Sequence, residues 1–443
     1  MSHILPIISR MDSYRDQELR PGSSHGGKNG LALALGLLAL PLSAADVPLG
    51  QPTINIQREA SEIRIAFTGT LQSAGAVTGP WLDLTNVSNP YTVDVTTGPA
   101  FFRSRHPDSI FASTSVIAMT LTGPLQKHFD LAYAGLPDGI FPPLREKPAF
   151  DGIAQVPGFT TPVTLRVRGN SSLQECPFPK LKLKVGKDER VLTPFFDARE
   201  IKIGTHCAEG GRGTIGRLRE EIAAYREALA YEVMNVLGFI SPRLRRASIT
   251  YHDTTSTNDN PISGWQVTRL AMIFDDVEVV AERLGGRALD DEEVAALTDA
   301  RFDPQLIGDL QFLHALLGNW DYRLSLDGRG LWNTDVIELP TGSLVPMAGD
   351  FDLCSWVTEI VKVSAPHDYL PELPPIERQA RYELEQIQRR VSAAIFSQAT
   401  SRFTEKRSAI EAQVAAALLD GAGRSNAVRH VTAFYEALAS VTR

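Results

Sequence analysis

The chain has 443 residues, of which 43% are hydrophobic, and a formal net charge of -8 at pH 7. This length and composition suffice for the cores of two or three domains of roughly 100–200 residues, which excludes wholesale disorder. A nucleic-acid partner is not expected, because the sequence has no cluster of Lys and Arg that could neutralise a phosphate backbone.

Residues 1–45 show the order of features typical of a secretory signal peptide. Positive charges precede an apolar run at 31–42, and the small residues at 43–45 then offer a cleavage site before Asp46. The run is shorter than the roughly 20 residues of a membrane-spanning helix. We therefore expect an exported protein, extracellular or periplasmic, whose mature chain has no transmembrane segment. A retained N-terminal membrane anchor is the alternative.

Residues 46–105 alternate apolar and polar positions between short turns. Ile63, Ile65 and Phe67 share one face, and Pro- and Gly-containing turns recur through the segment. This pattern predicts a small β-sandwich module. The stretch from Leu71 to Arg105 also resembles small β-modules of large exported bacterial proteins, which implies a spacer or docking unit.

The region 106–260 is predicted to be rich in strands, and the region 261–443 to be mainly helical. Apolar and polar residues alternate at 163–168, and lysines alternate with apolar residues at 180–185, as in half-buried strands. A helix at 218–236 follows, and Asp290 is a predicted N-cap of a later helix. A strand-rich part followed by a helix-rich part predicts a two-lobed α+β domain with a cleft.

Three segments contain the residue types that phosphoryl transfer needs. A lysine on a strand can hold phosphate oxygens while a carboxylate on a helix holds that lysine, and an aspartate can orient the attacking hydroxyl group. Oxygens of Asn and Asp can hold Mg²⁺ against the phosphates. The sequence offers these groups as lysines at 180–184, Glu227, Asp321, Asn333, Asp350 and Asp352.

Four motifs in this order make the chain from about Val163 to Trp356 similar to the spore-coat CotH-type kinase-like family. They are RGNSS followed by FPK and a lysine-bearing strand, Arg-Glu-x-Leu-Ala-Tyr at 226–231, Asn-x-Asp at 319–321, and Asp-Phe-Asp at 350–352. The resemblance implies a two-lobed, α+β protein-kinase-like domain. Its N-lobe would span 106–260 and its C-lobe 261–443, after the β-sandwich module at 46–105.

The resemblance also implies which residues contact ATP. Lys182 corresponds to the nucleotide-contacting lysine of the strand, with Lys184 and Lys202 as alternatives. Glu227 corresponds to the helix carboxylate, although it could instead form a surface pair with Arg226 or Lys202.

Catalysis and metal binding are assigned in the same way. Asp321 corresponds to the catalytic aspartate, Asp350 to the principal Mg²⁺ ligand and Asp352 to a second ligand. Asn333 is the candidate for the metal-binding asparagine, at a longer spacing from Asp321 than the family shows. Gly349 stands where the family often has an aromatic residue.

These roles imply a secreted kinase that transfers the γ-phosphate of ATP to Ser or Thr of another exported protein, with Mg²⁺ and ATP as cofactors. Two alternatives stay open. One is a catalytically inactive kinase-like protein that binds a partner or an envelope polymer, and the other is a structural or adhesion protein in which the β-module dominates.

The three cysteines of the chain include no Cys-x-x-Cys pair, so a structural zinc site is not expected. Export permits a disulfide, and the predicted bridge joins Cys176 to Cys207. Cys354 is predicted to be free and buried.

Overall fold

The computed structural model describes residues 54–442 except for 60–61, 76–79, 85–86, 95–100, 106, 135–146, 148, 170–172, 174–175, 177, 192, 207–219, 256–263 and 327–329. These residues belong to one compact unit, Asp46–Arg443. The predicted signal peptide at 1–45 lies outside the described residues. None of the helices in the described part has the length and hydropathy needed to cross a membrane.

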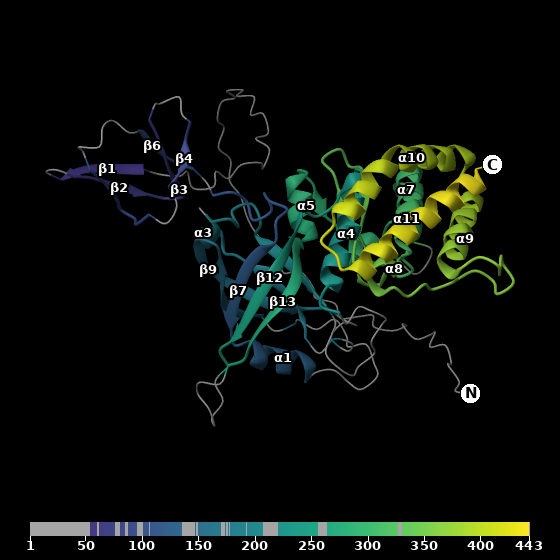
Figure 1. Ribbon diagram of the computed structural model, residues 1–443, viewed down its shortest axis with the longest axis horizontal. Coiled ribbons are helices and arrows are strands. Elements are labelled where there is room, and N and C mark those ends of the chain that lie inside the picture. The colour runs from purple at the N-terminus through teal and green to yellow at the C-terminus, as the bar shows by residue number, and fades with distance from the viewer. Residues whose placement is uncertain are drawn as a thin grey trace, which may run out of the picture. The chain divides into compact units, whose positions relative to one another are not determined.

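Seven strands form a closed barrel in the order β10-β11-β13-β12-β7-β8-β9 (Figure 1). Neighbouring strands run antiparallel except for β12 and β7, which are parallel, and the pairing of β10 with β9 closes the barrel. Leu165, Leu181 and Ile203 are buried in its core, as period-two alternation requires. The strands are β7 (Ile117–Gly123), β8 (Ala149–Val156), β9 (Phe159–Arg168), β10 (Lys180–Lys184), β11 (Glu200–Thr205), β12 (Leu244–Asp253) and β13 (Gln266–Asp275).

The prediction of a two-lobed protein-kinase-like domain is wrong. The strand-rich segment closes on itself through β9 and β10, and its last strand, β13, lies beyond residue 260. The alternation of apolar and polar residues predicted strands, but this alternation is the same in open and closed sheets. The chain forms a mixed α and β unit built on a barrel, with smaller sheets and many helices.

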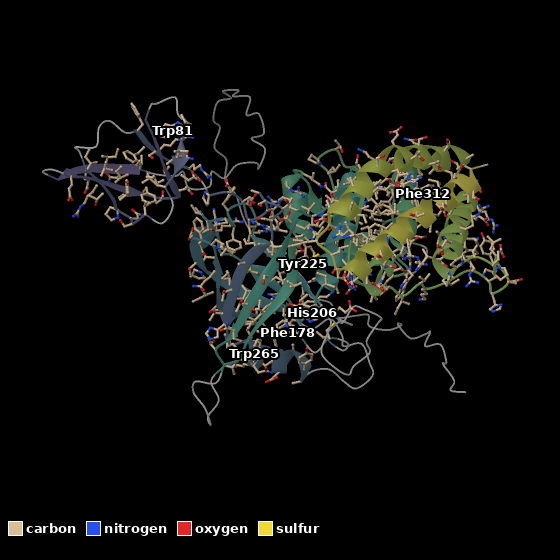
Figure 2. All side chains as sticks on the ribbon, viewed as in Figure 1. Trp81, Phe178, His206, Tyr225, Trp265 and Phe312 are labelled. Atoms are coloured by element: carbon tan, nitrogen blue, oxygen red, sulfur yellow. The ribbon has the colours of Figure 1, made fainter. Side chains whose placement is uncertain are left out.

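Two three-stranded sheets precede the barrel, in the orders β1-β2-β5 and β4-β3-β6. Tyr91 of β5 and Phe102 of β6 bring the two sheets together, with ring centroids 6.1 Å apart. Trp81, which is labelled in Figure 2, lies under the guanidinium group of Arg103. The strands are β1 (Ile54–Glu59), β2 (Glu62–Phe67), β3 (Thr70–Ala74), β4 (Leu82–Asp83), β5 (Tyr91–Asp94) and β6 (Phe101–Arg105).

Helix α4 (Ala223–Val236) connects the barrel to the helical part of the chain. It contacts β12 and β13 of the barrel as well as α8 (Ser355–Thr358) and α10 (Ala393–Ala416) (Figure 1). A helix that is covered on all sides needs small or apolar residues all round, and Ala228, Leu229 and Met234 meet this need. Arg226, Glu227 and Tyr231 of α4 are therefore held at buried positions.

Helix α7 (Pro304–Leu317) is the centre of the C-terminal helices. Asp303 caps its start, Pro304 occupies the first turn, and Gly318 ends it in a left-handed conformation. Phe312, labelled in Figure 2, contacts aromatic rings of α10 and α11 (Gly421–Val441). Helix α9 (Pro375–Arg390) packs against α7 and α11.

The remaining elements are short. The predicted N-cap Asp290 is confirmed, because it forms a capping box with Glu293 at the start of α6. A third sheet has the order β14-β15-β16. These elements are α1 (Leu125–Tyr133), α3 (Lys187–Arg190), α5 (Val277–Arg283), β14 (Arg287–Ala288), α6 (Asp291–Ala295), η3 (Asp299–Arg301), β15 (Thr334–Glu338), β16 (Leu344–Ala348) and η4 (Phe351–Leu353).

Arg226 connects α4 to the C-terminal helices through a buried charge. Its side chain is 1% exposed, and its Nη2 atom donates to Glu220 at 2.7 Å and to both carboxylate oxygens of Asp420 at 2.9 Å. Asp420 is the N-cap of α11. Removing one member of such a buried pair leaves the other charges uncompensated.

We expect Arg226→Ala to lower the free energy of unfolding by about 3–5 kcal/mol, because it removes the cation that pairs with the carboxylates of Glu220 and Asp420. Denaturation in urea, followed by circular dichroism, measures the change. Arg389→Ala is the control, since Arg389 is 67% exposed in its pair with Glu385, and it should cost less than about 1 kcal/mol. Equal losses for the two variants would contradict the structural role of Arg226.

Candidate functional site

The segment after α7 is held by a buried hydrogen-bond network. Asn319 accepts a hydrogen bond from the backbone N–H of Asp321 at 3.0 Å and donates to Nδ1 of His314 at 3.0 Å. His314 is fully buried and stacks on Tyr322, with ring centroids 3.7 Å apart. Burial lowers the pKa of His314 to about 3, so the ring is neutral and its Nδ1 can accept. Asn319 thereby fixes the backbone of Asp321.

The carboxylate of Asp321 is oriented by two donors from the segment before β15. Its Oδ1 atom accepts from Nε1 of Trp332 at 3.0 Å, and its Oδ2 atom accepts from Nδ2 of Asn333 at 2.9 Å. The same Nδ2 atom donates to the carbonyl oxygen of Asp321 at 2.7 Å. The amide nitrogen of Asn333 is thus committed to Asp321, while its Oδ1 atom has no hydrogen-bond donor among the described residues.

Asp350 lies next to Asn333, directly after β16. The backbone N–H of Gly349 donates to the carbonyl oxygen of Asn333 at 3.0 Å, and that of Asp350 donates to the hydroxyl group of Tyr231 at 2.9 Å. Asn333 and Asp350 both have φ of 51°, a left-handed conformation that costs energy outside glycine. Two such residues side by side, held by α4 and β16, mark this place as a candidate site.

A buried lysine contacts both aspartates of the Asp-Phe-Asp motif, and it is Lys180. Its Nζ atom is 2.8 Å from Oδ2 of Asp352 and 3.7 Å from Oδ1 of Asp350. Burial acts to lower the pKa of Lys180, but the charges of the Asp352 and Asp350 carboxylates act against it, and the pKa is raised. Lys180 is therefore an ammonium group within a set of three acidic side chains.

Lys182, the predicted nucleotide-contacting lysine, does not reach these aspartates. It forms ion pairs with Asp276 and, at 2.9 Å, with Glu200. Of the two alternatives, Lys184 is exposed and lies 3.6 Å from Glu200, and Lys202 lies 2.9 Å from Asp276. The three lysines thus belong to a separate cluster around the N-cap of α5.

Glu227 is buried on α4 beside the lysine and the two aspartates. Burial raises the pKa of Glu227 to about 8, with the charge of Lys180 acting against this rise and those of Asp352 and Asp350 adding to it. At neutral pH the side chain is therefore mostly protonated. Arg226 is engaged with Glu220 and Asp420, so the surface pair of Arg226 with Glu227 does not form.

The two aspartates of the motif differ in exposure and charge. Burial raises the pKa of Asp352, whose side chain is only 14% exposed. Burial also acts on Asp350, but the charges of Lys180, Arg168 and Lys202 outweigh it and lower the pKa. The Asp350 side chain is 51% exposed, so it is an anionic carboxylate that a solvent cation can reach.

The structure brings Asp321, Asn333, Asp350, Asp352 and Glu227 together. The charge of Asp321 acts on the pKa of Asp352, and Asn333 bonds to Asp321 and to Gly349. Reasoning from the sequence did not single out Lys180 or Arg168. The FPK motif could have identified Lys180, since that motif ends on it. The RGNSS motif could likewise have identified Arg168, since that motif begins with it.

These residues fit a magnesium ion that is bound together with phosphate. Among the described residues, no group of three or more His, Cys, Asp or Glu side chains could hold a metal ion alone. Mg²⁺ is commonly held by one or two carboxylates with phosphate oxygens and water. Asp350 and Asp352, with the free Oδ1 of Asn333, offer such a partial set. The buried Nε atom of Arg168 has no hydrogen-bond partner in the described part and suits an anion.

Two of the cysteines lie close in sequence to residues of the site, Cys176 before Lys180 and Cys354 after Asp352. Cys176 is disulfide-bonded, and Cys354 is free and buried. The predicted partner of Cys176 is Cys207, which lies outside the described residues.

No protein-family model matches the chain, and no curated protein matches it. Function must therefore be argued from the side chains of the site.

The raised pKa of Glu227 predicts a loss of stability with rising pH. The unfolded carboxyl ionises near pH 4.5 and the folded one near pH 8, so between these values folding favours the protonated form. The stabilisation is full below pH 4.5, and on the order of 4 kcal/mol is lost as pH approaches 8. Glu227→Gln should flatten this decline in urea denaturation measured at several pH values.

Glu436→Gln is the matched control, because Glu436 is exposed on α11, and it should keep the decline. A Glu227→Gln variant with the pH dependence of the parent protein would refute the protonated state.

Proposed function

We propose that this site binds Mg–ATP and transfers the γ-phosphoryl group to a serine or threonine hydroxyl group of another exported protein. The observation that carries the proposal is the pairing of an accessible, anionic Asp350 with the buried ammonium group of Lys180, next to the oriented carboxylate of Asp321. Phosphoryl transfer depends mainly on positioning and on charge, and these groups supply both.

The part of the site that would bind ATP contains both cationic and anionic side chains. Lys180 has three N–H donors. Asp352 takes one at 2.8 Å and Asp350 lies 3.7 Å away, which leaves one for a phosphate oxygen. Arg168 adds a second cation close enough to lower the pKa of Asp350. Asp350, Asp352 and Oδ1 of Asn333 would hold Mg²⁺. The bound ion would neutralise charge on the phosphates.

Asp321 would act on the acceptor. Its carboxylate accepts the proton of the hydroxyl group while the hydroxyl oxygen bonds to the γ-phosphorus atom. The bond from that phosphorus to the β,γ-bridging oxygen breaks, and ADP leaves with the electron pair. The hydrogen bonds from Trp332 and Asn333 fix the direction of the carboxylate, as proton transfer requires.

Asp350→Asn should abolish Mg-dependent ATP binding, because it removes the accessible charge that holds the cation. Asn tolerates the left-handed backbone at this position, so the fold should be retained. Titration calorimetry with Mg²⁺ and with EDTA measures the effect. Asp188→Asn, on exposed α3, is the control and should bind as the parent protein does. Equal ATP affinity in EDTA and in Mg²⁺ would refute the metal role.

Asp321→Asn should spare ATP binding but lower the rate of transfer by about 10²–10⁴-fold, because the carboxylate acts on the hydroxyl group. Radiolabelled ATP with a serine-containing acceptor gives the rate, and calorimetry gives the affinity. If the parent protein binds no ATP, this proposal is wrong, and the alternative of a non-catalytic binding protein takes its place. A transfer rate unchanged by Asp321→Asn would remove Asp321 from the mechanism.

A further inference from the structure

A polar pocket of about 720 Å³ begins beside Asp321 on the chain. Trp320 and Tyr322, the neighbours of Asp321, line it, together with Gln311, Lys362 and Arg390. The carboxylate of Asp321 is hydrogen-bonded to Trp332 and Asn333. The residues on both sides of Asp321 form part of the wall of this pocket, which we name the acceptor pocket.

The charge of the acceptor pocket is positive. Arg323, Lys362 and Arg390 line it, against one acidic residue, Glu383. Glu383 is already engaged, since it accepts hydrogen bonds from Ser364 at 2.9 Å and from Gln379 at 2.6 Å. Lys362 lies over the ring of Trp320 at 4.2 Å, and neither Lys362 nor Arg390 has a carboxylate partner among the described residues.

Two lining residues also have polar atoms that lack partners. The indole N–H of Trp320 and the amide Oε1 of Gln311 are buried and make no hydrogen bond in the described part of the chain. Leaving a buried polar group without a partner is unfavourable. A polypeptide segment offers both complements, namely carbonyl or carboxylate acceptors for Trp320 and backbone N–H donors for Gln311.

We propose that the acceptor pocket binds an acidic polypeptide segment next to the serine or threonine that receives the phosphoryl group; this inference rests on the proposed function. Carboxylates of the segment meet Lys362 and Arg390, and one carboxylate accepts from the indole N–H. An extended chain advances about 3.3–3.6 Å per residue. A hydroxyl group only a few residues from the bound acidic side chain therefore reaches Asp321.

A fluorescence anisotropy experiment without ATP tests the pocket. The probes are fluorescein-labelled hexapeptides of one serine with five glutamates, with five glutamines or with five lysines. We expect the glutamate peptide to bind at low ionic strength and the glutamine peptide to bind at least about tenfold more weakly. Lys362→Glu combined with Arg390→Glu should lower the affinity for the glutamate peptide by a similar factor. Trp320→Phe should lower this affinity less.

Lys406→Glu combined with Arg407→Glu is the matched control, since it makes the same change of net charge on α10. It should leave the affinity unchanged. The proposed role of the acceptor pocket would be refuted by equal binding of the glutamate and glutamine peptides or by no binding of either. Equal losses of affinity in the two double variants would also refute it. Peptide binding requires no nucleotide, so a chain that binds the glutamate peptide but not ATP would overturn the proposed function and retain the pocket.

Discussion

The buried ammonium group of Lys180 is the interaction on which the site depends. It belongs to barrel strand β10, and its partners Asp350 and Asp352 follow β16, so one ion pair joins segments more than 150 residues apart in the sequence. Without it, three acidic side chains would lie together in a poorly solvated space. Buried pairs of this kind add little net stability, because desolvation offsets the attraction. A costly cluster with perturbed pKa values at one place favours a functional role over a purely structural one.

The identity of that lysine shows where prediction from the sequence ends. The period of a strand places Lys180, Lys182 and Lys184 on the same face of β10, and their alternation with apolar residues predicted that face. The three side chains nevertheless meet different partners, because Lys180 lies against the Asp-Phe-Asp segment, Lys182 pairs with Asp276, and Lys184 is exposed. Which lysine is buried depends on what covers each part of the strand, and that is a property of tertiary packing.

The fold was predictable to the level of its elements and not beyond. Alternation and capping signals indicated strands and helices, including the N-cap at Asp290. Closure of the barrel depends on the pairing of β9 with β10 and on the parallel pairing of β7 with β12, whose residues lie over 120 positions apart. Periodicity within one strand carries no information on such pairings. Because the kinase-like fold is wrong, an analogy at the level of fold no longer supports the function. What remains are the ion pairs of Lys180 with Asp350 and Asp352 and the hydrogen bonds that orient Asp321, and function resides in such contacts.

The balance of charge limits what this site can bind. Asp350 is anionic and half exposed, while Lys180, Arg168 and Lys202 are cations whose charges act on it. A metal ion alone would meet Asp350 but would also be repelled by these three cations. A phosphate alone would meet Lys180 and Arg168 but would be repelled by Asp350 and Asp321. A phosphate that carries its own divalent cation satisfies both halves at once. The positions of these charges, and not any resemblance, are the basis for proposing a metal–nucleotide complex as the ligand.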